Sequence, residues 1–353
     1  MLKKLSKQKI SDIITYGIVL VAFIVMQILI NAGQISSLFE GLMVPLCTYI
    51  ILAISLNLVV GVLGELSLGH AGFMCVGAFT SAFFSKCMQD TITNSIVRFL
   101  IALLIGIVVA AIFGLLIGIP VLRLNGDYLA IVTLAFGEII KNIVNVLFIG
   151  KDPKGFHFST KDVMALNMEP DGKVIVNGPQ GITGAPKDAT FFIGFILVLI
   201  TLFIVLNLIH SRDGRAIMAI RDNRIAAESI GINITKYKLM TFTISAAMAG
   251  AAGVLYGHNL SNLTANTNNF GYNMSINILV FVVLGGIGNI RGSIISAVVL
   301  TLLPELLRGL SDYRMLIYAI VLIVMMLFNW APKAIEWREK YLSFKKNKKE
   351  AVK

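Results

Sequence analysis

The chain is a succession of long apolar runs separated by short polar segments. Several of these runs have 17 or more residues, and each is long enough to cross a hydrocarbon core roughly 30 Å thick. The pattern predicts an all-α polytopic integral membrane protein with about 8–10 transmembrane helices. The expected spans cover residues 16–30, 42–60, 73–84, 96–119, 128–148, 191–209, 239–256, 276–284, 294–307 and 315–328.

Two glycine-rich breaks interrupt apolar runs, at residues 61–72 and 285–292. Non-helical backbone at membrane depth is tolerated only where protein or a water-filled cavity satisfies its polar groups. Paired interrupted segments in a transporter point to the substrate path, whereas small residues also serve close helix packing or surface loops. On the first interpretation, the candidates in the breaks for the substrate path are Glu65, Ser67, Gly69, His70, Gly286 and Gly288.

A third polar feature lies in the span over residues 128–148. Glu138 and Lys141 are three residues apart on one helical face, so they can pair with each other. With Asn142 and Asn145 they can instead line a polar path, to which Thr133 also belongs by position. We therefore add Thr133 and Glu138 to the candidates for the substrate path, and both interpretations of Glu138 stay open.

The distribution of charge predicts the topology. The net charge is +11, and the excess sits before the first span, in residues 212–238 and in the tail, while residues 150–190 carry five lysines and five acids. Because basic residues stay on the cytoplasmic side, we expect both termini inside. The whole chain, 1–353, then forms one transmembrane domain with an extracytoplasmic loop (150–190), a cytoplasmic coupling loop (211–238) and a basic cytoplasmic tail (332–353).

The segment from Ser211 to Gly231 is a charged island between two spans. Read as a single helix, it gathers Ile217, Ile220, Ile225 and Ile230 on one broad apolar face. Such a helix can pass mechanical force to a soluble partner. The alternative is an ordinary basic loop lying beside anionic lipid.

Nothing in the sequence supports a catalytic centre. There is no GxxxxGK[ST] phosphate loop, no HExxH and no GxSxG, and the glycines at 285–292 do not have the spacing of a dinucleotide site. Cys47, Cys75 and Cys87 have no metal-binding spacing. We expect no metal and no cofactor bound by this chain.

Five stretches, in order along the chain, resemble the permease subunits of branched-chain amino acid ABC importers, and the long loop resembles the larger of the two permease types. The stretches are 57–61 with 64–73, 126–130 with 133–139, 178–184, 211–216 with 219–223 and 226–227, and 285–288. Ala226, Ala227 and Gly231 are also similar to the end of the EAA-x-x-x-G loop of such permeases, although Ile225 stands where that motif has glutamate.

The resemblance implies a bacterial cytoplasmic-membrane protein that moves leucine, isoleucine or valine. It also implies partners: a second homologous permease, two ATP-binding cassette subunits that hydrolyse the ATP, an extracytoplasmic binding protein and surrounding lipid, with no nucleic acid. The residues that it implies for coupling to the ATPase are Arg212, Gly214, Arg215, Arg221, Asp222, Ala226, Ala227 and Gly231.

Three alternatives remain at this point. Relatives on the same scaffold carry urea or short-chain amides. A stand-alone secondary transporter would use intramembrane carboxylates, for which Glu65 and Glu138 qualify. An integral-membrane enzyme would need clustered acids or a metal site, and neither is visible in the sequence.

Overall fold

A computed structural model describes residues 7–33, 36–122, 127–310 and 313–330. The basic tail predicted at 332–353 lies outside this part of the chain. The helices are α1 (Lys7–Asn31), α2 (Ser37–Asn57), α3 (His70–Cys87), α4 (Ser95–Val121), α5 (Asp127–Val146), α6 (Phe191–His210), α7 (Arg212–Asp222), α8 (Arg224–Ser229), α9 (Ile234–Gly257), α10 (Thr267–Phe270), α11 (Tyr272–Gly285), α12 (Ile290–Leu306) and α13 (Arg314–Trp330). The strands are β1 (Phe148–Asp152), β2 (Gly155–Ser159), β3 (Lys173–Asn177), β4 (Ile182–Thr183) and β5 (Asn262–Leu263).

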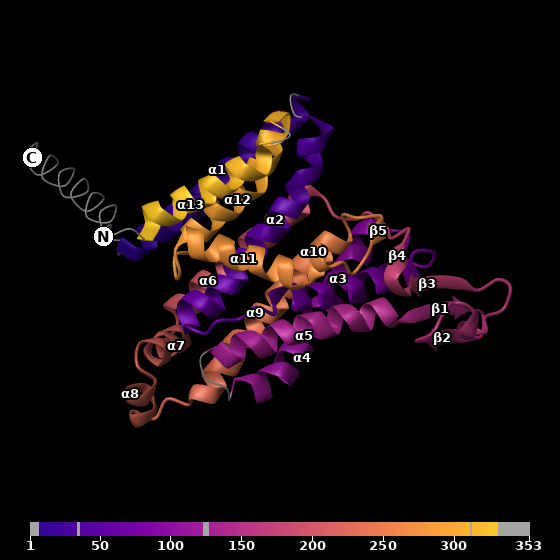
Figure 1. Ribbon diagram of the computed structural model, residues 1–353, viewed down its shortest axis with the longest axis horizontal. Coiled ribbons are helices and arrows are strands. Elements are labelled where there is room, and N and C mark those ends of the chain that lie inside the picture. The colour runs from indigo at the N-terminus through magenta and orange to yellow at the C-terminus, as the bar shows by residue number, and fades with distance from the viewer. Residues whose placement is uncertain (1–6, 34–35, 123–126, 311–312, 331–353) are drawn as a thin grey trace, which may run out of the picture.

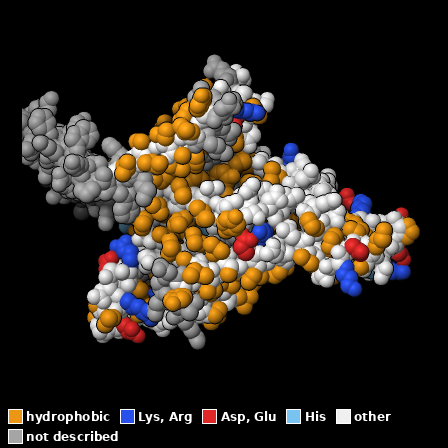
Figure 2. Space-filling view, in the orientation of Figure 1, with side chains coloured by type: hydrophobic (Ala, Val, Ile, Leu, Met, Phe, Trp, Pro, Cys, Tyr) orange, Lys and Arg blue, Asp and Glu red, His pale blue; other side chains and the backbone are white. Residues whose placement is uncertain are grey.

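The predicted class, an all-α polytopic membrane protein, is confirmed. Within the described residues, seven helical segments are long and apolar enough to cross a membrane. Three further apolar helices, α3, α11 and α13, are shorter or less apolar than these seven. On the face shown in Figure 2, many charged side chains lie at the ends that carry the sheet and α7–α8, and apolar side chains cover much of the surface between these ends.

The centre of the bundle is formed by α2 and α9, onto which α3, α4, α6, α11 and α12 pack. Small residues bring the central helices together. A Cβ added at Gly77 of α3 would lie only 2.2 Å from the carbonyl oxygen of Gly250 in α9. Because lipid gives helices little hydrophobic reason to associate, such close backbone contact is a main source of packing energy.

The two ends of the bundle are built differently (Figure 1). At one end, α7 and α8 project beyond the spans; at the other lies a sheet in the order β2-β1-β3, together with the β4–β5 pair. The sequence predicted a loop at 150–190, and the structure shows an antiparallel sheet of β1, β2 and β3 in and beside that segment. The buried Asp188 anchors this end to α4, since Arg98 donates two hydrogen bonds to its carboxylate, at 2.9 and 2.7 Å.

Both predicted breaks are present. The π-helix Leu58–Leu63 follows α2 and ends at Gly64, which has a left-handed φ of 82°, and non-helical backbone then leads to α3. The second break separates α11 from α12. The breaks meet each other, because a Cβ on Gly61 would lie 2.3 Å from the nitrogen of Gly288.

This contact predicts that Gly61→Ala destabilises the fold. The added methyl would overlap backbone, which cannot move aside as a flexible side chain can, so we expect a loss of about 1–3 kcal/mol. Thermal denaturation of the purified protein, followed by size-exclusion chromatography, measures the effect. Gly41→Ala in α2 is the matched control, because a Cβ there meets nothing within 4 Å. Equal melting temperatures for the two variants would show that the contact between the breaks is not tight.

A second prediction concerns the sheet. The buried Asp152 carboxylate accepts hydrogen bonds from the backbone N–H groups of Lys154 and Gly155, at 2.8 and 2.9 Å, and lies 2.8 Å from His157 Nε2. Burial alone would raise the pKa of Asp152, but the backbone hydrogen bonds and the charge of His157 outweigh burial and lower it. A lowered pKa in the folded state stabilises the sheet above the ordinary carboxyl pKa of about 4.

That stabilisation is lost as the pH falls below about 4. We therefore expect pepsin to cleave the segment 148–177 increasingly as the pH is lowered from about 5 to 2.5, measured by mass spectrometry of the fragments. Asp152→Asn should increase cleavage already at the upper end of this range. The control is Asp171→Asn, since Asp171 is exposed. Cleavage of the Asp152→Asn variant that matches this control would contradict the role of the carboxylate.

Candidate functional site

The first break is held by hydroxyl groups from neighbouring helices. The N–H of Leu68 donates to Thr133 Oγ1 of α5 at 3.0 Å, and the N–H of Ala71 donates to Ser275 Oγ of α11 at 3.2 Å. Leu68 lies outside a regular helix and Ala71 lies in the first turn of α3, so each bond satisfies a backbone donor that has no intrahelical partner. The break is therefore a fixed element of the bundle centre.

A buried polar cluster forms around the start of α3. His70 Nε2 lies 2.9 Å from Ser245 Oγ, and Ser245 donates in turn to the carbonyl of Ser55. Ser67 and Thr133 are fully buried, and His70 is 1% exposed. Among the described residues, Ser67 Oγ and His70 Nδ1 have no hydrogen-bond partner. These two atoms leave unused hydrogen-bonding capacity inside the protein.

Four of the predicted path residues thus come together: Ser67, Gly69, His70 and Thr133. Gly69 packs against Thr133, whose carbonyl oxygen would lie 2.6 Å from a Cβ on Gly69. The cluster is enclosed in this conformation, so a substrate reaches it only if the surrounding helices move apart.

Glu65 forms an ion pair outside this cluster. Its carboxylate pairs with Lys238 at the start of α9, and both side chains are largely buried, at 15% and 4% exposure. Removing one member of such a pair leaves an uncompensated charge, which makes the pair a structural requirement. Sequence reasoning missed Lys238 as the partner because 173 positions separate the two residues.

Glu138 and Lys141 form an ion pair, which confirms the pairing interpretation. The pair also ties α5 to the next elements. Glu138 accepts a hydrogen bond from the N–H of Tyr272 at 2.7 Å, and Lys141 donates to Thr267 Oγ1 at 3.1 Å. These contacts hold α10 and the start of α11 against α5.

Beside this junction lies a polar surface, of which the sequence analysis identified only Asn142. Asn268, Asn273, Ile276 and Asn277 line a cavity of about 290 Å³ on α10 and α11, and Asn142 is exposed on α5. We call these five residues the asparagine face. The asparagine-rich run at 259–273 was the available signal, but periodicity alone does not show which side of a helix is exposed.

The second break lies away from the His70 cluster. Gly286 and Gly288 belong to the turn between α11 and α12, and the N–H of Gly288 donates to Asn57 Oδ1 at 2.9 Å. Asn57 is fully buried and also donates to Ser293 Oγ at 2.8 Å. Asn57 therefore joins the last turn of α2 to the second break and to the first turn of α12.

The charged island contacts the breaks directly. Arg221 of α7 donates a hydrogen bond from Nη1 to the carbonyl oxygen of Gly61 at 3.0 Å, and its other nitrogens bind Asp222. A carbonyl at the end of a helix lacks an intrahelical partner, which Arg221 supplies. One side chain thus links the island to the point where the two breaks meet.

The prediction of a single helix for the island is wrong. Asn223 has an extended backbone (φ −157°, ψ 104°), and its side chain caps α8 by accepting from the N–H of Ala226. The strong N-cap preference of asparagine explains the break. Ile217 and Ile220 are buried, but Ile225 and Ile230 are 81% and 74% exposed, so they do not share one buried face.

The other residues implied for coupling lie along α7, α8 and the following turn. Arg212, Arg215, Asp222 and Ala226 are exposed, while Gly214 and Ala227 are buried. Gly231 has a left-handed φ of 85° and turns the chain from α8 towards α9.

Comparison with known proteins agrees with this architecture. Residues 37–328 match the family described as the branched-chain amino acid transport system / permease component. The chain is 35% identical over 296 residues to the high-affinity branched-chain amino acid transport system permease protein LivM of Salmonella typhimurium, covering 81% of this chain and 67% of that protein. The LivM protein of Escherichia coli matches to the same extent.

Two further relatives share less identity with the chain. The permease protein LivH of Escherichia coli is 25% identical, covering 79% of this chain and 89% of that protein. The fructose import permease protein FruG of Bifidobacterium longum is also 25% identical and covers 94% of both chains. No solved structure matches the chain. The family match extends over most of the chain, and the chain belongs to the family of branched-chain amino acid transport system permease components.

Proposed function

We propose that this chain is the membrane-spanning permease subunit of an ABC importer for leucine, isoleucine and valine. In this proposal ATP is hydrolysed by two partner subunits, and the chain itself binds no cofactor and catalyses no reaction. The names of the relatives support the substrate class, because the LivM proteins that share 35% identity are branched-chain amino acid permeases.

The asparagine face is the observation that carries the proposal. Exposed asparagines on the side of a spanning bundle are costly in lipid, so a second protein or a water-filled path has to cover them. A second, homologous permease that packs on α5 and α11 would enclose the path between the two chains. The LivH relatives support this partner, because they are branched-chain amino acid transport system permease proteins whose sequences are related to that of this chain.

The chemistry of the asparagine face fits a small zwitterion. Amide side chains both donate and accept hydrogen bonds, so they can solvate an ammonium and a carboxylate without binding either tightly. Ile276 supplies an apolar wall among them. A side chain such as that of leucine would lie against this wall while its charged groups meet Asn273 and Asn277.

The island formed by α7 and α8 is the proposed contact for the ATPase subunits. Ile225 and Ile230 are exposed at its tip, where an apolar groove on a partner would bury them. Arg221 then connects any displacement of α7 to Gly61 and the junction of the two breaks. This arrangement couples nucleotide binding to the packing of the spans.

The proposed orientation follows from the charge distribution. The termini and residues 211–238 lie in the cytoplasm, and the segment 150–190 faces the extracytoplasmic binding protein across the bacterial cytoplasmic membrane. The sheet and the island lie at opposite ends of the bundle, as this orientation requires (Figure 1).

ATP-driven uptake tests the proposal. The chain would be reconstituted in proteoliposomes with its second permease, ATPase subunits and binding protein, and uptake of labelled leucine compared with that of urea and fructose. We expect uptake of leucine alone, dependent on ATP. Uptake of urea or fructose without leucine would overturn the substrate class, and uptake by this chain alone under an ion gradient would overturn the ABC mechanism.

Arg221→Gln tests the coupling role in the same vesicles. Loss of a hydrogen bond from a charged group costs about 1.5–3 kcal/mol, so we expect ATP-driven uptake to fall roughly tenfold or more while the ATPase subunits still copurify. Lys236→Gln removes the same charge from an exposed position and should leave uptake almost unchanged. Equal effects of the two substitutions on ATP-driven uptake would contradict the role of the Arg221 contact.

Cysteine accessibility tests the path. In a background with Cys87→Ser, Asn277→Cys should react with a water-soluble maleimide in the assembled transporter, whereas Leu104→Cys on the exposed side of α4 should not. A difference of roughly tenfold or more is expected, because the reactive thiolate forms only where water reaches the sulfur. Reaction of Asn277→Cys as slow as that of Leu104→Cys would place the asparagine face in lipid and contradict the path.

A further inference from the structure

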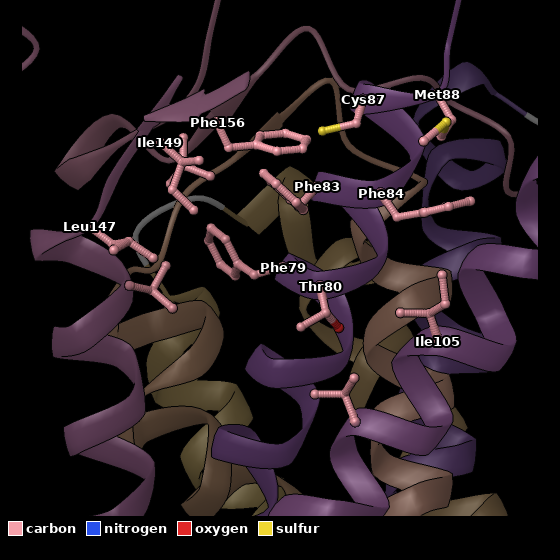
Figure 3. A pocket seen from close by; sticks show the side chains of 13 residues that line it. Phe79, Thr80, Phe83, Phe84, Cys87, Met88, Ile105, Leu147, Ile149 and Phe156 are labelled. Carbon is pink, nitrogen blue, oxygen red and sulfur yellow. The ribbon is translucent and has the colours of Figure 1, made fainter. Parts of the chain in front are cut away.

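An apolar cavity of about 470 Å³ lies between α3, α4 and α5, beneath the sheet (Figure 3). Its size is that of a small-molecule pocket. Leu147 and Ile149 lie on one side of it, Phe79 and Phe83 point into its centre, and Phe156 of β2 reaches over it from the sheet (Figure 3). The complete lining is Phe79, Thr80, Phe83, Phe84, Cys87, Met88, Ile105, Val109, Val144, Leu147, Ile149, Phe156 and Val176.

The wall of this cavity offers no polar group to a ligand. The hydroxyl of Thr80 donates to the carbonyl of Val76 in its own helix at 2.6 Å, which leaves its methyl group for the cavity. An amino acid placed here would have unpaired ammonium and carboxylate groups, which burial makes very costly. The cavity therefore suits an alkyl chain and does not suit the proposed transport substrate.

The cavity adjoins the lipid-facing surface of the bundle. In α4, Ile105 and Val109 line it, while their neighbours Leu104 and Val108 are 63% and 54% exposed. In α5, Val144 lines it and Val146 faces outwards. Because apolar side chains surround the cavity on the bundle surface, an acyl chain can enter from the bilayer without crossing polar groups.

The side chain of Lys151, a cation, lies at the edge of this cavity nearest the sheet. The Lys151 ammonium lies 5.9 Å from the centroid of the Phe156 ring and donates to the carbonyl of Cys87 at 3.4 Å. Phe156 and Cys87 both line the apolar cavity. Within the described residues, Lys151 is in no ion pair with a carboxylate, so its charge is available to an anion.

A second cavity, also about 470 Å³, continues from this point. It shares Cys87 with the first cavity and is polar. Its ionisable residues are Lys86, Asp90, Lys151, Asp152, Asp171 and Lys173. Lys173 pairs with Asp90 at 3.6 Å, and Asp152 binds His157, so Lys151 and Lys86 are left to receive a phosphate. Lys86 also donates to the carbonyl of Thr183, which fixes its position.

We propose that the two cavities together bind one glycerophospholipid. One acyl chain fills the apolar cavity, and the phosphate lies beside Lys151 and Lys86 in the polar cavity. Asp171, on the wall of the same polar cavity, favours a headgroup that also carries an ammonium, such as phosphoethanolamine. The lipid contacts α3, α4, α5 and the sheet, and it fills the space that protein side chains leave between them.

Native mass spectrometry of the purified chain tests this proposal without any partner subunit. Its failure is therefore distinct from failure of the transport proposal. Dioleoyl phosphatidylethanolamine is titrated into detergent micelles holding the protein, with diolein, which has the same chains and no phosphate, as the comparison. We expect one retained phospholipid per chain and much weaker retention of diolein.

Two pairs of variants locate the site. Lys151→Glu should weaken phospholipid retention about tenfold, because it replaces a cation with an anion at the phosphate. Its control is Lys161→Glu, which should retain the phospholipid because Lys161 is exposed and lines neither cavity. Val144→Trp should fill the apolar cavity and also abolish retention, whereas Val146→Trp, on the outer side of the same helix, should not.

Three results would each overturn the proposal. They are equal retention by the Lys151→Glu and Lys161→Glu variants, full retention by Val144→Trp, and diolein that binds as tightly as the phospholipid. Size-exclusion chromatography checks that each variant is folded. Because Lys151 is exposed, we expect Lys151→Glu to fold, so the Lys151 pair tests the proposal even if Val144→Trp fails to fold.

Discussion

The need to satisfy backbone polar groups at the two breaks governs this structure. At each break, carbonyl and N–H groups leave the regular helix and lose their intrahelical partners. The protein supplies partners from other elements: Thr133 and Ser275 for the first break, Asn57 for Gly288, and Arg221 for Gly61. These side chains come from α5, α11, α2 and α7, so satisfying the breaks also fixes how those elements pack.

Part of this arrangement follows from sequence alone. The glycine breaks, the Glu138–Lys141 pair and the long spans are local patterns, in which neighbouring residues determine the outcome. The partners of the breaks are not local: Asn57 and Gly288 are 231 positions apart, and Glu65 and Lys238 are 173 apart. The island was misjudged for a local reason, since the capping preference of Asn223 outweighed the spacing of the isoleucines.

The candidate path residues divide into a closed set and an open set. Ser67, His70 and Thr133 are buried around the start of α3, whereas Asn268 and Asn277 are exposed and Asn273 is half-buried beside them. Sequence reasoning found Ser67 and His70 because they interrupt an apolar run, and it found Thr133 by its position in a span. It missed the asparagines of α10 and α11, because these helices look like an ordinary loop and a short span. The sequence shows a run rich in asparagine at 259–273, but which side of a helix is exposed is a property of the packed bundle.

In the proposed transporter these two sets have different tasks. The asparagine face needs only a second permease to become a path, whereas the His70 cluster opens only if α3 separates from α5, α9 and α11. Such a movement would break the hydrogen bonds of Leu68 and Ala71, which are costly to lose in a dry interior. Energy for that change has to come from outside this chain. The hydrogen bond from Arg221 to Gly61 links the first break to the island, which faces the proposed ATPase subunits.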